Sequence, residues 1–303
     1  ISPPLNPATA VEKIDHVSIL THDIERSINE YEQLFDTEFF VTEPVGMQSI
    51  QATKSAMSAN GIELVETKDK NLVKRYGESA WATALKVPNV ELALAQLKRH
   101  GVTALDTQTA ARRTVALLDT NDTVGLPIKL VSYTPHYSIA DLEVVKAWKK
   151  RQGTSLERSV RERVVVDQLD HVIIMVRDLE KSMRFFETVF GSVFSRARGS
   201  DFATDGLGIE LVQSPKSQVL TRSGADSAIG FLSFKVNNYD QSRQLLKKHK
   251  AYELKEHSLD TRRVALMALS QPLLGIELIE YEPLAHPIAA NEMRIDLSSS
   301  VSR

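Results

Sequence analysis

The chain has 303 residues, with 37 Lys or Arg, 39 Asp or Glu and a formal net charge of −2. It has no basic block and no apolar run near the roughly 20 residues of a membrane span, so we expect no nucleic-acid or membrane partner. The absence of cysteine excludes disulfides, thiolate catalysis, iron–sulfur clusters and cysteine-type zinc sites.

Residues 1–11 contain Pro3, Pro4 and Pro7 and show no helical or strand period, so an extended arm is predicted. The sequence starts at Ile1, and removal of a leader is one interpretation of this start. We expect a cytoplasmic protein, with an exported form as the alternative.

An α+β pattern begins after the arm. Apolar and polar residues alternate over 13–20, which predicts a strand, and Asp23 then precedes apolar residues at helical spacing through Phe35, which predicts an N-capped helix. Strands are predicted near 37–44, 47–56 and 61–66. The order of elements is therefore βαβββ.

The same order recurs three more times along the chain. The second unit has a predicted strand at 81–87, a helix ending at Gly101 and strands near 102–107, 112–119 and 126–133. The third has a strand at 169–176, a helix between Asp178 and Gly191 and strands near 193–198, 200–204 and 208–213. The fourth has a strand at 231–236, a helix from Tyr239 and strands near 251–256, 262–269 and 275–281. Such a repeat predicts a tandem duplication of a duplicated unit.

Two domains follow from these four units, at 12–137 and 167–283. Leu142, Val145 and Trp148 at helical spacing, followed by mixed charges, predict a helical connector over 138–166. Residues 284–303 are predicted to be a tail.

Residues that can bind a metal occupy some of the equivalent positions of the four units. The position seven residues before each helix cap is occupied by His16, Ala82, His171 and Phe231. The last strands, aligned on their Ile-Glu-Leu element, place Glu63, Lys129, Glu210 and Glu277 in one position. An imidazole paired with a carboxylate is a donor set for a divalent metal.

Two sequence elements resemble the vicinal oxygen chelate superfamily, which includes glyoxalase I, methylmalonyl-CoA epimerase, extradiol dioxygenases and bleomycin-resistance proteins. They are Asp15-His16-Val17 and Asp170-His171-Val172, each followed by Asp-Ile/Leu-Glu-Arg/Lys-Ser, and the Gly61-Ile62-Glu63-Leu64-Val65 type of last strand. The resemblance covers about 12 to 283. It implies four βαβββ modules in two cupped mixed sheets, with a metal held in a cup by one residue from each of four strands.

The resemblance also implies which residues are ligands. His16 and Glu63 match the ligands of a first module, and His171, Glu210 and Glu277 match those of the second half. If each half forms its own cup, one cup holds His171, Glu210 and Glu277 and the other holds His16, Glu63 and Lys129. If the halves exchange modules, Glu277 joins His16 and Glu63. Either pairing leaves one cup in which Lys129 can pair with a glutamate in the place of a metal.

One histidine and two carboxylates can hold Fe, Mn, Ni or Zn with open positions. The implied function is a divalent-metal-dependent lyase, isomerase, epimerase or oxygenase that chelates two neighbouring oxygens of a small substrate. Glu277 is the candidate ligand or mobile base, and His257 is a second catalytic candidate on a loop beside the cup. An extradiol dioxygenase is disfavoured because Phe231 stands where that branch has a histidine.

The missing histidines and Lys129 favour a second hypothesis, a metal-free small-molecule-binding protein of the bleomycin-resistance type. A scaffold with relic cups is a third. Phe231 and Lys129 are candidate substrate contacts. The pairs Arg112-Arg113 and Arg262-Arg263 lie at like places, and we take Arg113 and Arg263 as candidate anion-binding residues, with a solvated strand face as the alternative. A monomer or homodimer is expected, because one chain completes both cups.

Overall fold

The computed structural model describes residues 10–134, 163–259, 262–270 and 273–281. The strands of the first half are β1 (Lys13–Thr21), β2 (Phe39–Thr42), β3 (Ala52–Ser58), β4 (Ile62–Thr67), β5 (Ala80–Lys86), β6 (Ala104–Ala110), β7 (Arg113–Leu118) and β8 (Ile128–Tyr133). Those of the second half are β9 (Val166–Val176), β10 (Phe194–Ser195), β11 (Phe202–Asp205), β12 (Ile209–Gln213), β13 (Ser227–Val236), β14 (Tyr252–Leu259), β15 (Arg262–Ser270) and β16 (Leu273–Tyr281).

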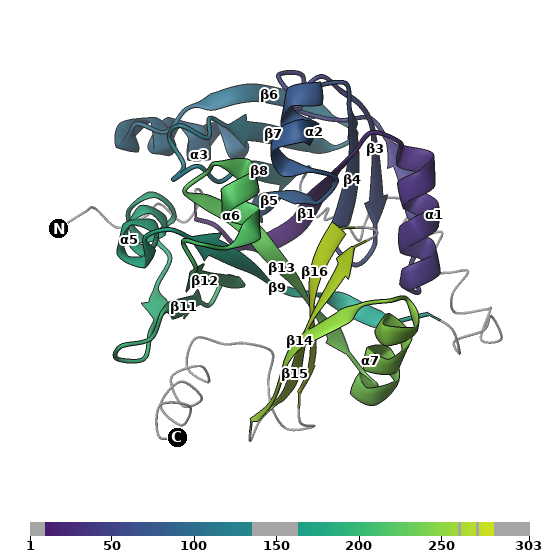
Figure 1. The fold of residues 1–303 in the computed structure, drawn as a ribbon. Helices are drawn as coiled ribbons and strands as arrows, with labels where there is room; N and C mark the ends of the chain where they lie inside the picture. The colour runs from purple at the N-terminus through teal and green to yellow at the C-terminus, as the bar shows by residue number, and fades with distance from the viewer. Residues whose placement is uncertain (1–9, 135–162, 260–261, 271–272, 282–303) are drawn as a thin grey trace.

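The strands form two eight-stranded mixed sheets with the same internal order (Figure 1). The first runs β2-β3-β4-β1-β5-β8-β7-β6 and the second runs β10-β11-β12-β9-β13-β16-β15-β14. The α+β tandem duplication is thereby confirmed. Because β1 pairs with β5 and β9 pairs with β13, each half forms its own cup, and modules are not exchanged between halves.

The described helices are α1 (Ile24–Leu34), α2 (Lys70–Tyr76), α3 (Val90–Leu97), α5 (Leu179–Phe190), α6 (Gln218–Ser223) and α7 (Tyr239–Lys248). The predicted caps are confirmed: the side chains of Asp23, Asn89, Asp178 and Asn238 each accept a backbone N–H of the first helical turn. Helices α2 and α6 were not predicted, because a helix of seven or six residues between two strands leaves little apolar period to detect.

The halves share one hydrophobic core, formed by the helix-covered faces of the two sheets. The rings of Phe35 and Phe234 lie 5.3 Å apart between centroids, joining the two halves. Backbone hydrogen bonds cross the same junction, from Leu169 N to Asn60 O at 3.1 Å and from Ile14 N to Leu207 O at 3.3 Å. The opposite face of each sheet is therefore the one that lines a cup.

Several predicted boundaries need correction. Residues 43–51 form a loop, and β3 begins only at Ala52 rather than near residue 47. His257 lies within strand β14 rather than on a loop. Strand β10 has only two residues, and β13 begins four residues before Phe231.

Other expectations lie outside the described residues: most of the arm, residues 138–162 of the connector, and the tail. The domain bounds stay a prediction. No helix in the described part of the chain is long and apolar enough to cross a membrane.

Candidate functional site

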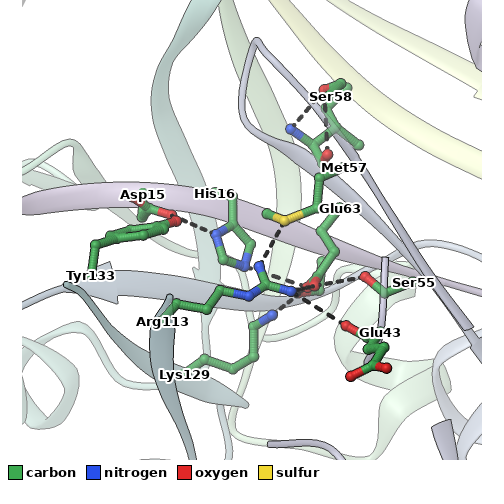
Figure 2. A network of polar contacts seen from close by, with 12 residues as sticks. Asp15, His16, Glu43, Ser55, Met57, Ser58, Glu63, Arg113, Lys129 and Tyr133 are labelled. Carbon is green, nitrogen blue, oxygen red and sulfur yellow. Dashed lines mark hydrogen bonds and ion pairs between the residues drawn. The ribbon is translucent and has the colours of Figure 1, made fainter. Parts of the chain in front are cut away.

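The N-terminal cup brings His16, Glu63 and Lys129 together from strands β1, β4 and β8 (Figure 2). The Lys129 ammonium donates a hydrogen bond to Glu63 Oε2, and His16 Nε2 lies 3.4 Å from the same oxygen. The Glu63 and Lys129 side chains are each only 1% exposed. A lysine ammonium thus neutralises the carboxylate inside this cup.

Neighbouring side chains complete this buried network. Ser18 and Ser55 donate to the two oxygens of Glu63 at 2.7 and 2.9 Å. The Arg113 guanidinium lies 4.0 Å from Glu63. Burial alone would raise the pKa of Glu63, but the charges of Lys129 and His16 hold it well below its usual value.

The mouth of the N-terminal cup is closed by residues 43–51, which we call the plug loop. Met47 and Ile50 of this loop pack into a buried cluster on the cup face together with Trp81. Gly46 has φ +68°, and an added Cβ would lie 2.6 Å from Val115 O, so the loop is pressed against β7. This cup is a packed interior. With an ammonium beside its carboxylate, it does not fit a metal ion.

The C-terminal cup has a different donor set, contributed by His171 on β9, Glu210 on β12 and Glu277 on β16. His171 Nε2 lies 3.1 Å from Glu277 Oε1 and 3.7 Å from Glu210 Oε2. The Nε2–Glu277 contact is an ion pair when the imidazole is protonated, and His16 Nε2 in the other cup has the corresponding contact with Glu63. The Glu210 side chain is 22% exposed, so this cup is open to solvent.

The second ring nitrogen of His171, Nδ1, is hydrogen-bonded to Asp170. Asp170 Oδ2 lies 2.8 Å from His171 Nδ1 and also accepts a hydrogen bond from the Tyr281 hydroxyl at 2.9 Å. Ser233 donates to Glu277 Oε1 at 2.7 Å. A carboxylate behind a histidine is the usual support of a metal-ligating imidazole, because it fixes the ring and turns its other nitrogen toward the ion.

Charge coupling shifts the titration of this cluster. Burial alone would lower the pKa of His171, but Glu277, Asp170 and Glu210 together raise it to about 10. Burial raises the pKa of Glu210 to about 7, and Glu277 adds to this rise while His171 opposes it. Without a metal, the imidazolium itself therefore partly neutralises the two carboxylates.

The fit to a metal ion depends on donor type and spacing. Among the residues that the structure describes, no three His, Cys, Asp or Glu side chains converge as ligands of a single ion. In the C-terminal cup the separations from His171 Nε2 are 3.1 and 3.7 Å. Neighbouring ligand atoms at bond lengths near 2.1 Å lie about 3.0 to 3.4 Å apart. A shift of a few tenths of an ångström at Glu210 would bring this separation into that range, and one imidazole with two carboxylates is a donor type that suits a divalent ion.

The strand register selects Arg262 rather than Arg263 from the second arginine pair. Arg113 pairs with Tyr133, and at the equivalent place Arg262, not Arg263, pairs with Tyr281. The charge of Arg262 acts on Glu210, where it opposes the rise in pKa.

Arg263 instead faces helix α7. Its guanidinium forms an ion pair with Asp240 at 2.7 Å and lies 4.2 Å from the centroid of the Tyr239 ring. The expectation that Arg263 contacts the substrate is therefore corrected. The sequence already indicated that only one of the two adjacent arginines can face the cup, because successive strand residues face opposite sides of a sheet. The choice between the two arginines required the register.

A cavity of about 400 Å³ lies at one end of the C-terminal cup, bounded by Phe231, Met175 and Gly230 and by helix α6. The Phe231 ring packs directly against Gly275, where an added Cβ would lie only 2.8 Å from the ring. None of the three proposed metal ligands lines this cavity. Phe231 is thus placed beside the donor set rather than within it.

Two family models, both described as Glyoxalase/Bleomycin resistance protein/Dioxygenase superfamily, match residues 15–116 and 168–264. Together the matches span more than half of the chain. The protein belongs to this superfamily, in a tandem form. No curated protein sequence matches the chain.

The chain is similar to many solved structures, of which three follow. One is the Mn(II)-bound glyoxalase from Novosphingobium aromaticivorans, at 11% identity and TM-score 0.58, covering 89% of this chain and 82% of that one. A mutant of 4-hydroxymandelate synthase from Streptomyces coelicolor has 14% identity and TM-score 0.57, with 97% and 99% covered. The 2,3-dioxygenase LapB from Pseudomonas sp. KL28 has 12% identity and TM-score 0.59, with 94% and 99% covered. At such identities the likeness concerns the fold.

Proposed function

We propose that the C-terminal cup is a divalent-metal centre and that the protein is a glyoxalase-like enzyme. The single observation that carries the proposal is the difference between the cups. Glu277 stands in the C-terminal cup where Lys129 stands in the N-terminal one. One imidazole and two carboxylates therefore face each other without a lysine between them. A metal ion compensates such a set in the way that Lys129 compensates Glu63.

In this proposal His171, Glu210 and Glu277 hold the ion, which is Fe, Mn, Ni or Zn by donor type. The Mn(II)-bound glyoxalase among the similar structures supports a divalent metal. When bound, the ion acts as a Lewis acid toward two neighbouring oxygens of a small oxygen-rich substrate. The reaction class is a lyase, isomerase, epimerase or oxygenase.

The protein's own groups have two tasks in this scheme. Asp170 and Tyr281 fix the tautomer and direction of the His171 ring. Glu277 is the proposed mobile base, because its carboxylate lies on the cup face and Ser233 orients one of its oxygens. His257 lies two strands from Glu277, about 10 Å at the backbone, so we place it on the cup wall rather than at the reacting atoms.

The alternative is a metal-free binding protein. Its supporting observation is the pKa of His171, which is raised to about 10 chiefly by Glu277 against the effect of burial. The imidazolium then serves as the internal cation of this cup. In either case we propose a small-molecule ligand, a cytoplasmic location and a monomer or homodimer.

Metal analysis of protein purified without chelators tests the proposal. We expect close to one divalent ion per chain, lost in Glu277→Gln and kept in Glu63→Gln, which is the matched change in the other cup. Substoichiometric metal that does not rise on addition of Mn, Fe, Ni or Zn would falsify the enzyme hypothesis and leave the binding protein.

A further inference from the structure

The two halves allow a residue-by-residue comparison of what covers each cup. Strand register makes Asp106 on β6 equivalent to Lys255 on β14, since both lie in one row across the sheet with the residue in the last ligand position. By the same register Gln108 is equivalent to His257. All four residues point to the cup side of their strands.

In the N-terminal half these wall positions hold the plug loop. The Ser49 N–H donates to Asp106 Oδ2 at 2.7 Å, and the Gly46 N–H donates to Gln108 Oε1 at 2.9 Å. The next residues along the loop, Ile50 and Met47, enter the apolar cluster on the cup face. In each case one loop residue binds an acceptor on the wall, and the next loop residue enters the apolar cluster.

The plug loop has no equivalent in the C-terminal half. Phe40 pairs with Met57 across the first hairpin, whereas Ser195 pairs with Thr204 across the second, which makes the second hairpin eight residues shorter. The cup face is correspondingly less covered. Leu20, Val65 and Leu117 are buried, and their counterparts Met175, Val212 and Leu266 are partly exposed.

A difference in one side chain also leaves space on the cup face of the C-terminal half. Trp81 of the buried cluster corresponds to Gly230, since both directly precede the residue in the first ligand position of their module. The cavity of about 400 Å³ lies at this place, lined in part by Met175, Gly230 and Phe231. Ser79 and Ala80 of the N-terminal half also line it, and the part beside Gly230 corresponds to the space that Trp81 fills in the other half.

The charge of the wall changes with the loss of the loop. The acceptors Asp106 and Gln108 are replaced by Lys255 and His257, both exposed. Within the described residues, no ion pair or hydrogen bond is formed by either side chain, although both backbones are paired with β15. A donor wall beside an apolar cavity complements an acceptor group carried on an apolar body.

We propose that the C-terminal cup binds an amphipathic anion, with its acidic group on Lys255 and His257 and its apolar body in the cavity at Gly230. The ligand takes the place that the plug loop and Trp81 occupy in the other half. This assignment rests on the proposed function for the substrate class, because the bound anion is then the substrate presented to His171, Glu210 and Glu277. The acidic group is a carboxylate or a phosphate.

Calorimetric titration of the full chain with octanoate, octyl phosphate and octanol tests the inference, in metal-loaded and chelator-treated protein. We expect both anions to bind more tightly than octanol, and Lys255→Ala to weaken the anions about ten-fold while leaving octanol unchanged. Gly230→Trp should abolish binding of all three. The new ring requires the Met175 side chain to shift, because an added Cβ at Gly230 would lie 2.7 Å from its Cε and 2.8 Å from its Cγ.

Lys54→Ala is the matched control, since Lys54 is an exposed strand lysine of the N-terminal half. Anions that bind no better than octanol, or that are insensitive to Lys255→Ala, would overturn the inference. Anion binding that persists in a protein unable to bind metal supports the inference while refuting the metal centre. Metal binding without any anion binding supports the metal centre and refutes the inference.

Discussion

Replacing Lys129 by methionine tests whether this lysine stands in for a cation in the N-terminal cup. Lys129→Met keeps the length and most of the volume of the side chain, so the expected effect is electrostatic. It leaves the Glu63 carboxylate, 1% exposed, without its ammonium partner. Removing one partner of a buried ion pair costs about 3–5 kcal/mol. Arg113 lies 4.0 Å from Glu63 and compensates in part, so we expect about 3 kcal/mol.

Urea unfolding at pH 7 measures this loss, and Lys129→Met/Glu63→Gln provides the control. The glutamine carries no charge; its amide oxygen accepts from one of the Ser18 and Ser55 hydroxyls and its NH2 group donates to the other, so the double variant should regain at least half of the loss. A single variant within about 1 kcal/mol of the unmodified protein, or a double variant no more stable than the single one, would refute the reasoning.

The pH dependence of Lys129→Met gives a second check on the same cup. In the unmodified protein the pKa of Glu63 lies well below its ordinary value of 4.5, so its contribution to stability is present above pH 4.5 and lost as the pH falls further. In Lys129→Met burial dominates and raises that pKa. The stability deficit should therefore shrink between pH 7 and pH 5; a constant deficit would contradict this.

Three further predictions concern the donor set and the plug loop. Metal affinity should rise from pH 6 to pH 8 with release of protons, because Glu210 with its pKa of about 7 and His171 with its pKa of about 10 must lose protons to bind. Calorimetry in buffers of different ionisation enthalpy counts the released protons. A pH-independent affinity would argue against both ligands. Tyr281→Phe should weaken metal binding about ten-fold in a chelator competition, while Tyr133→Phe in the other cup should not, and equal effects would contradict the assignment. Gly46→Ala should destabilise the protein by about 1–3 kcal/mol, since its φ is +68° and the new Cβ meets Val115 O at 2.6 Å; a thermal melt unchanged within error would show that the plug loop is not tightly seated.

The repeat could be derived from the sequence because helix caps are local signals. Counting back from the caps placed His16, Ala82, His171 and Phe231 in one position, and the register of the paired strands agrees with that alignment. Local capping needs only a few neighbouring residues, so it survives even where the overall sequence has diverged.

The contents of the cups could not be derived in the same way. Whether Glu277 faces His171 or His16 depends on which first strands pair, and that is a long-range choice. The plug loop was predicted to begin a strand, because its apolar residues Val45, Met47 and Ile50 are those of a buried segment. They are buried against the cup face rather than within a sheet ladder. The sequence could not select Arg262 over Arg263 for a similar reason, since only the register separates the two.

The two cups thus show one fold used in two ways. In the first half a lysine, a tryptophan and the plug loop fill the cup, and Lys129 and Glu63 form an ion pair within its buried polar network (Figure 2). In the second half the lysine is replaced by Glu277 and the tryptophan by Gly230, and the hairpin is shorter. The first half is then expected to contribute stability and the second to bind ligand.

Anomalous diffraction from crystals grown with Mn(II) tests the central claim most directly, because it locates the ion without reference to activity. The account predicts one peak between His171, Glu210 and Glu277 and none beside Glu63. A peak in the N-terminal cup, or no peak in either cup at saturating Mn(II), would contradict it.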